Sequence, residues 1–304
     1  MTGKPGRARR PRVIAGVDGS PHSAAALAWA AADARLRGWE LVVVTACAQG
    51  ARPAGPGTDP AAACEQDCDE MQARMLRGLP AGAAPPVSTR VLHGDPVAAL
   101  VAAVTAADVL VVGTRGQGRV RALLLGSVAQ GCAGRAPCPV VVVPSPPRDA
   151  ARPAADDGPV VAGVDSSPGA RAALRFAAGE AALRGAALLP VHAVYPDYTT
   201  AQDDAGRGMA GDDDLLPPLD SAWAQLDMLV RTELAGLDVT AQPVALCGDP
   251  ATVLLRLTES AALVAVGARG AGRLYAALPG SVSTRLLRQG HCPVAVIPAS
   301  AGYS

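Results

Sequence analysis

Residues 108–130 read DVLVVGTRGQGRVRALLLGSVAQ, and residues 262–284 follow the same plan as ALVAVGARGAGRLYAALPGSVST. Each copy opens with an apolar run typical of a buried strand, passes through a glycine-rich loop and reaches a Gly-Ser pair. Glycines let a backbone approach an anion closely, and the N–H groups at the start of a helix point at it. The stretch therefore predicts a strand, a loop able to hold phosphate and a helix, and it predicts them twice.

The helix after each loop is expected to start at the Gly-Ser pair. Ser127 can be the N-cap of the first one, with Gln130 three residues on to complete a capping box. The second copy has Thr284 at that position, so its box is not standard.

The rest of the chain repeats in the same way. Asp18 and Asp165 each follow a short apolar run and lie just before a Ser-Pro pair that can start a helix. Five apolar runs alternate with four helical segments in each half, which predicts right-handed crossovers and a parallel sheet covered on both faces. We expect an α/β fold with two tandem doubly wound domains. The third strand of the second half is expected at 240–246, and the fifth strands at 138–143 and 292–297.

The chain has 304 residues, enough for two domains of about 150 residues each. We divide it into a disordered basic tail (1–11), a first domain (12–145), a linker (146–158) and a second domain (159–299). The second half has an acidic segment at 196–218, which we expect to be solvated and mobile.

Composition narrows the functional classes. The formal net charge is zero, which argues against nucleic acid as a partner, and no apolar run is long enough to cross a membrane. Lys4 is the only lysine, so phosphate contacts must come from backbone N–H groups, serine or arginine. No secretory signal is apparent, and we expect a cytoplasmic protein.

The seven cysteines show little pattern. Cys138 and Cys292 precede a proline in equivalent places and are expected to be small buried residues. Cys64 and Cys68 are four apart on an expected helix, a spacing that could indicate metal or redox chemistry. Because no second pair or nearby histidine completes a site, we expect solvated or half-buried thiols there and no metal centre.

The pattern Gly-x-x-Gly, nine residues, Gly-Ser resembles the nucleotide-binding signature of the universal stress protein family, in its glycine-loop, ATP-binding form. The resemblance covers 12–144 and 159–298. It implies Rossmann-like domains, each a five-stranded parallel sheet in the order 3-2-1-4-5. ATP would then lie beyond the carboxyl ends of strands one and four, two molecules per chain, with or without Mg²⁺. The alternative is that the glycines only make tight turns.

Carried over residue by residue, the resemblance places an aspartate near adenine and ribose, an alanine whose backbone reads the adenine edge, and a glycine loop around the ribose and triphosphate. The first site would comprise Gly16, Asp18, Ala46, Val112, Gly113, Thr114, Arg115, Gly116, Gln117, Gly118, Gly126 and Ser127. The second would comprise Gly163, Asp165, Ala193, Val266, Gly267, Ala268, Arg269, Gly270, Ala271, Gly272, Gly280 and Ser281.

Some roles stay open at this point. Asp18 could merely cap a turn. Arg115 and Arg269 could neutralise phosphate or face water, and the histidines have no partner in the other repeat. No catalytic residue is assigned, because Ser127 and Ser281 have no base that the sequence reveals.

The strand order that the resemblance implies makes the fifth strands, Val140–Val143 and Val294–Ile297, edges of their sheets. Because both runs are apolar without alternation and flanked by prolines, we expect them to pair with each other as an internal pseudo-dimer. In addition to this internal pairing, we expect the chain to form a homodimer.

The function that fits these features is an ATP-binding, cytoplasmic regulator or sensor in the stress response. One alternative is a slow ATP-hydrolysing enzyme of the adenine-nucleotide hydrolase-like fold. Another is a nucleotide-free dimerisation or scaffold module.

Overall fold

A computed structural model describes residues 9–47, 59–79, 85–116, 125–144, 157–194, 219–268 and 280–300. The predictions for most of the basic tail, the linker, the acidic segment and the middle of each glycine loop lie outside these residues. Within them, no helix is both long and apolar enough to span a bilayer.

The two halves contain matching elements. The first has strands β1 (Arg12–Gly16), β2 (Glu40–Cys47), β3 (Val87–His93), β4 (Val109–Gly113) and β5 (Val140–Val143), and helices α1 (Pro21–Arg37), α2 (Pro60–Arg77), α3 (Pro96–Ala103) and α4 (Ser127–Arg135). The second has strands β6 (Val160–Gly163), β7 (Leu188–Val194), β8 (Val244–Cys247), β9 (Leu263–Gly267) and β10 (Val294–Ile297), and helices α5 (Pro168–Arg184), α7 (Leu219–Glu233), α8 (Pro250–Leu257) and α9 (Ser281–Gln289).

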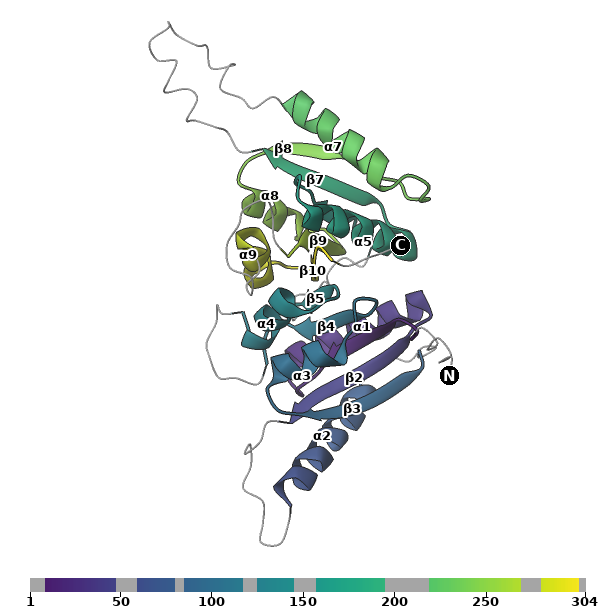
Figure 1. Cartoon of the computed structure of the whole chain (residues 1–304), viewed down its shortest axis with the longest axis vertical. Helices are drawn as coiled ribbons and strands as arrows, with labels where there is room; N and C mark the ends of the chain where they lie inside the picture. Colours follow the sequence, from purple (N-terminus) through teal and green to yellow (C-terminus); the bar gives the residue numbers. More distant parts are fainter. Residues whose placement is uncertain are drawn as a thin grey trace, which may run out of the picture.

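All ten strands form one sheet, in the order β3-β2-β1-β4-β5-β10-β9-β6-β7-β8 (Figure 1). Each half has the order 3-2-1-4-5 and is parallel throughout. The halves join where β5 pairs with β10 antiparallel, in a register that sets Val141 opposite Ala295. The predicted α/β fold and the predicted pairing of the fifth strands are both confirmed.

The central strands of the sheet are buried on both faces, which explains their unbroken apolar runs, whereas the outermost strands β3 and β8 are partly exposed. In β4, Val109 and Val111 face the layer formed by α1, α2, α5 and α7, whereas Leu110 and Val112 face the layer formed by α3, α4, α8 and α9. Each layer runs across both halves. The two repeats therefore share their hydrophobic cores.

Helix ends follow the local signals in the sequence. Ser20 and Ser167 accept N–H groups of the first turns of α1 and α5, and a proline is the first residue of each helix. Gly38 and Gly185 end the same helices with φ of 65° and 63°, a left-handed conformation that favours glycine. These ends fix the lengths of the two helices that meet across the junction.

Two local predictions were wrong. The N-cap of α4 is Gly126 and not Ser127, because the carbonyl of Gly126 already accepts the N–H of Gln130 at 3.1 Å. Strand β8 begins at Val244 and not at residue 240, since Pro243 has no N–H to offer a neighbouring strand. Only an isolated bridge between Leu188 and Ala241 precedes it.

A buried network of four charges lies where α1 meets α5. Asp33 and Arg37 of α1 hold equivalent places to Glu180 and Arg184 of α5. Arg37 Nε donates to Asp33 at 2.7 Å, and Arg184 Nη2 lies 3.3 Å from the same carboxylate. Arg37 is also paired with Glu180. Arg184 Nη1 and Glu180 Oε2 face each other as an ion pair without the alignment of a hydrogen bond.

Aromatic rings cover this charge network with the same pseudo-symmetry. The guanidinium of Arg184 lies 5.2 Å from the ring centre of Trp29, and that of Arg37 lies 5.9 Å from Phe176, the equivalent residue. Cation–π contacts offset part of the cost of removing the guanidinium groups from water. The network therefore ties the two halves together with charge as well as with apolar contact.

We predict that Glu180→Gln destabilises the protein by about 3–5 kcal/mol, because it leaves two buried guanidinium groups sharing one carboxylate. Arg171→Ala is the matched control on the same helix, since Arg171 is exposed and Glu233 retains Arg175. It should cost less than about 1 kcal/mol. Urea unfolding measures both, and equal losses in the two variants would contradict the role given to the network.

Candidate functional site

A cavity of about 500 Å³ opens beyond the carboxyl ends of β1 and β4. The chain leaves these adjacent strands toward opposite faces of the sheet, and open α/β sheets bind ligands at such a point. The wall consists of Gly16, Val17, Asp18, Ser23, Val44, Ala46, Pro96, Leu100, Val112, Gly113, Arg115, Gly116, Leu125, Gly126, Ser127, Val128 and Ala129.

Asp18 has two roles in this wall. Its Oδ1 accepts the N–H of Ser20 at 3.0 Å and so caps the turn after β1. Its Oδ2 lies against the glycine loop, where a Cβ added to Gly116 would be only 2.5 Å away. The carboxylate therefore sits between the cavity and the loop, and Gly116 is needed for their close approach.

Two further glycines allow the loop to approach helix α1 and then α4. A Cβ on Gly113 would lie 2.7 Å from the backbone carbonyl of His22. Gly126 donates its N–H to the carbonyl of Thr114 at 2.8 Å, which closes the loop at its base. The first N–H groups of α4, which have no acceptor within the helix, are thereby brought to the cavity wall.

Ala46 directs backbone groups toward the cavity. Strand β1 ends opposite Val44, whose carbonyl accepts from Val17, so β2 extends beyond its neighbour. The carbonyl of Cys47 faces the other side, where it accepts from Gly94. Since alternate residues of a strand point their backbone groups to opposite neighbours, the N–H and C=O of Ala46 face the space beyond β1.

A second cavity of about 290 Å³ lies at the equivalent place in the other half, beyond β6 and β9. Asp165 accepts the N–H of Ser167 at 2.9 Å, and Gly280 donates to Ala268 at 2.8 Å. The wall consists of Gly163, Val164, Asp165, Ser167, Ala170, Val191, His192, Ala193, Pro250, Leu254, Val266, Gly267, Gly280, Ser281, Val282 and Ser283.

Comparison with known proteins identifies the family. The model of the universal stress protein family matches residues 10–144 and 158–298. The chain belongs to this family. It is 32% identical to universal stress protein Rv1996 of Mycobacterium tuberculosis, over 93% of this chain and 94% of that protein. It is 33% identical to Rv2005c of the same organism, over 93% and 96%.

The fold agrees with a solved universal stress protein from Archaeoglobus fulgidus DSM 4304. The TM-score is 0.64 at 19% identity, and the match covers 96% of this chain and 98% of the other. At that identity the likeness supports the tandem architecture, and the site rests on the residues themselves.

The structure brings together most of the predicted site residues of this universal stress protein. In the first half Thr114 does not line the cavity, and Gln117 and Gly118 lie outside the described residues. In the second half Ala268 does not line it, and Arg269, Gly270, Ala271 and Gly272 lie outside. The remaining predicted residues line one cavity or the other.

Sequence reasoning missed the apolar part of each wall and one histidine. Val44 and Leu100, with Val191 and Leu254 in the second half, shape the cavities without any polar signal. Alternation offered one clue, because Val44 and Val191 each lie two residues before the predicted alanine. His192 lines the second cavity and hydrogen-bonds the carbonyl of Val164 through Nδ1 at 2.7 Å.

His22 distinguishes the two glycine loops. Its Nδ1 lies 3.1 Å from Thr114 Oγ1, whereas the second half has Gly169 in this place. Burial lowers the pKa of His22 from its ordinary value of 6.5, Arg115 lowers it further, and Asp18 opposes both. The described start of the first glycine loop therefore contacts an imidazole whose pKa is lowered, and the second half has no histidine at the equivalent position.

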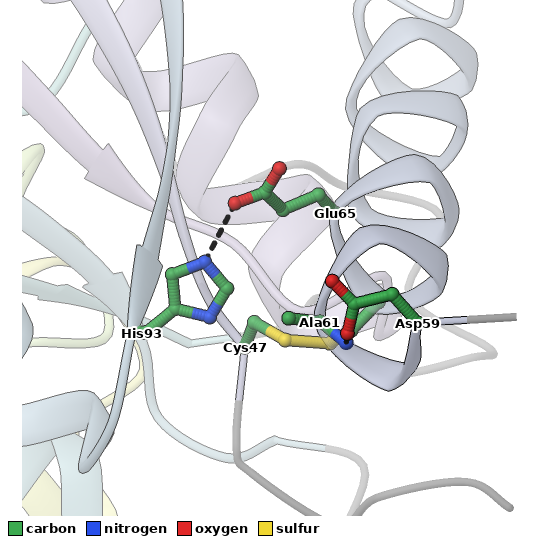
Figure 2. Close-up of a disulfide and its surroundings, with 6 residues drawn as sticks. Cys47, Asp59, Ala61, Glu65 and His93 are labelled. Carbon is green, nitrogen blue, oxygen red and sulfur yellow. Dashed lines mark hydrogen bonds and ion pairs between the residues drawn. A yellow bond between two sulfur atoms is a disulfide. The ribbon is translucent and has the colours of Figure 1, made fainter. Parts of the chain in front are cut away.

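The prediction for Cys64 was wrong. Cys64 forms a disulfide with Cys47 (Figure 2). Cys68 is a buried free thiol and not a solvated or half-buried one. The partner of Cys64 lies on another element, 17 residues away, which the spacing along the helix could not reveal. Cys138 and Cys292 are buried, as expected. Among the described residues, no three His, Cys, Asp or Glu side chains gather closely enough to hold a metal ion.

His22 should make the folded protein less stable in mild acid. Its lowered pKa means that the unfolded chain binds the proton more readily, so stability falls as the pH drops through and below 6.5. His22→Asn should lose less stability than the wild type between pH 8 and pH 5. Urea midpoints at several pH values measure this difference, with pH 8 as the internal reference. Parallel profiles would contradict it.

Proposed function

We propose that this universal stress protein binds ATP in each half and acts in the cytoplasm as a regulator or sensor of the stress response. The observation that carries the proposal is that an aspartate, the glycines that flank a glycine-rich loop and a helix start converge on each cavity. At about 500 Å³, the first cavity is of the size that small-molecule ligands occupy. The second, at about 290 Å³, lies at the lower limit of that range.

The backbone of Ala46 can recognise adenine. Its N–H donor and C=O acceptor face the same space and complement the acceptor ring nitrogen and donor amino group on one edge of adenine. Guanine presents an acceptor oxygen where adenine has the amino group, so it would set two acceptors against each other. Ala193 has the same orientation, because the carbonyl of Val191 accepts from Val164 and that of Val194 from Gly248.

The opposite side of the cavity suits the ribose and the phosphates. The carboxylate of Asp18 can accept a ribose hydroxyl, and Gly116 lets the backbone approach the phosphates closely. The first N–H groups of α4 carry partial positive charge. Arg115 lines the same wall and can neutralise phosphate charge, so the site has a cation although the chain has no lysine there.

Two other roles can be separated from this one. Slow ATP hydrolysis would require a water-positioning group beside the phosphates, and it would appear as ADP formed during binding measurements. A scaffold role is favoured by the shared sheet, which joins the halves through β5 and β10. It predicts a folded protein that binds no nucleotide.

Calorimetry should count two ATP per chain. Gly116→Glu places a second carboxylate against Asp18 and blocks the first site, and Gly270→Glu is the equivalent change in sequence. Each single variant should retain one site and the double variant neither. Losing two charge-assisted N–H contacts, at about 1.5–3 kcal/mol each, weakens binding about a hundredfold or more.

Gly179→Glu is the matched control for these variants. Gly179 lies on α5 with open space where a side chain would begin, so the same substitution there should leave both sites intact. A wild-type stoichiometry of zero, or a double variant that still binds two ATP, would show that the glycine loops are only turns.

ATP should bind more tightly than GTP at both sites, by about tenfold or more. The reason is that guanine would leave one backbone acceptor of Ala46 or Ala193 unpaired, at a cost of about 1–3 kcal/mol. Competition of GTP against bound ATP measures the ratio. Equal affinities would rule out base recognition by these strand ends.

A further inference from the structure

Two contacts, one covalent and one not, connect helix α2 to the ends of β2 and β3 and lie side by side (Figure 2). The disulfide joins Cys47, at the end of β2, to Cys64 in α2. A hydrogen bond joins His93, at the end of β3, to Glu65, the next residue of α2, with Nε2 and Oε1 2.7 Å apart. Cys47 and His93 are register partners on neighbouring strands, so their side chains emerge on the same face of the sheet.

This corner is accessible from solvent. His93 and Glu65 are exposed, and Cys64 is half-buried, whereas Cys47 is only 3% exposed. A small thiol from solution would therefore reach the sulfur of Cys64 first. The leaving group would then be the sulfur of Cys47, the register partner of His93. An adjacent imidazolium lowers the pKa of a thiol, and a thiol of lower pKa leaves faster in disulfide exchange.

We propose that Cys47–Cys64 is an exchange site for low-molecular-weight thiols, whose opening loosens the wall of the first cavity. A thiolate attacks Cys64 Sγ, which forms a mixed disulfide and releases Cys47 as a thiolate that takes up a proton. A second thiol attacks the mixed disulfide. The products are a small-molecule disulfide and two protein thiols. The two small-molecule thiols supply both electrons.

The bridge occurs in one half of an otherwise repeated structure. Val194 and Cys247 take the places of Cys47 and His93 at the ends of β7 and β8, and Cys247 is a free, exposed thiol. A bridge needed only for folding would be expected in both halves. In a reducing cytoplasm, moreover, disulfides are typically transient, catalytic or redox-sensing.

The bridge is close enough to influence the first cavity. Ala46, directly before Cys47, lines that cavity. Helix α2 holds the same strand through Gln72, whose buried amide donates to Thr45 Oγ1 at 2.9 Å and to the carbonyl of Arg90 at 3.0 Å. Opening the bridge leaves this amide contact but frees the end of β2 from α2. The effect on nucleotide affinity rests on the proposed function, whereas thiol exchange does not.

The exchange is tested by counting thiols in the Cys247→Ser variant, which removes the exposed background thiol. The native oxidised variant should show no fast-reacting thiol, and exposure to millimolar reduced glutathione should generate two. His93→Gln should slow this opening without changing the final count, because a charged imidazole beside the bridge favours departure of the thiolate. A bridge that stays closed in glutathione while the protein is folded would overturn the proposal.

The coupling is tested by ATP titration of Gly270→Glu, which retains only the first site. Reduction should weaken binding about five- to thirtyfold, the factor expected if binding must re-order one backbone residue. When Cys47→Ser and Cys64→Ser are added to Gly270→Glu, ATP should bind as it does to reduced Gly270→Glu, with or without reductant. Gly116→Glu, which retains the second site, should not respond. Equal first-site affinity in the two redox states would overturn the coupling.

A protein that does not bind ATP at all would give a different result in these experiments. ATP would then bind neither redox form of any variant, while the thiol count would still report the exchange. In that case amide hydrogen exchange of β2 decides the structural consequence. Residues 45–47 should exchange faster in the reduced protein, and an unchanged rate would overturn the claim that the bridge holds this wall.

Discussion

The antiparallel pairing of β5 with β10 is the constraint on which the rest of the structure depends. It makes one sheet of two, and it places α1 and α5 on the same face at the junction. Once these helices touch, residues equivalent by repetition must meet their counterparts. Each helix carries an acidic and a basic residue four positions apart, and each of these can also reach the oppositely charged residue of the other helix. Asp33 and Glu180 therefore each contact both Arg37 and Arg184.

The cavities depend on a different constraint, the close approach of backbones. Gly113 and Gly267 let the ends of β4 and β9 lie directly against the starts of α1 and α5, where any side chain would collide with main-chain atoms at 2.7–2.8 Å. A collision with the main chain cannot be relieved by a change of rotamer. The positions of these two strand ends, which line the cavities, are therefore set by atoms that cannot easily move.

Repetition made much of this structure predictable. Strands, helices and the aspartates of both sites followed from patterns that occur twice, because a spacing found in two copies is unlikely to arise by chance. Strand order did not follow from residues, since apolar runs do not say which run lies beside which. The family resemblance supplied it. The N-cap of α4 was misjudged by one residue because Gly126 and Ser127 both suit that position.

Contacts between distant elements were the least predictable. Asp33 and Arg37 look like an ordinary surface pair on one helix, and nothing local indicates that Glu180 will join them. Cys47 ends a strand and gives no sign of its partner in α2. The same limit explains the apolar cavity walls, because valine and leucine have the same pattern whether they face a helix or a ligand.

Because both halves of the antiparallel junction belong to one chain, their pairing does not depend on protein concentration. When two such sheets belong to separate chains, their pairing is lost on dilution, and related chains can exchange partners. Here Val143 and Val160 are joined by 16 intervening residues, which keeps the effective concentration of one half near the other in the millimolar range. Each half therefore keeps the same partner at any expression level. The chain can combine two dissimilar sites, one beside a disulfide and one without, in a fixed one-to-one ratio.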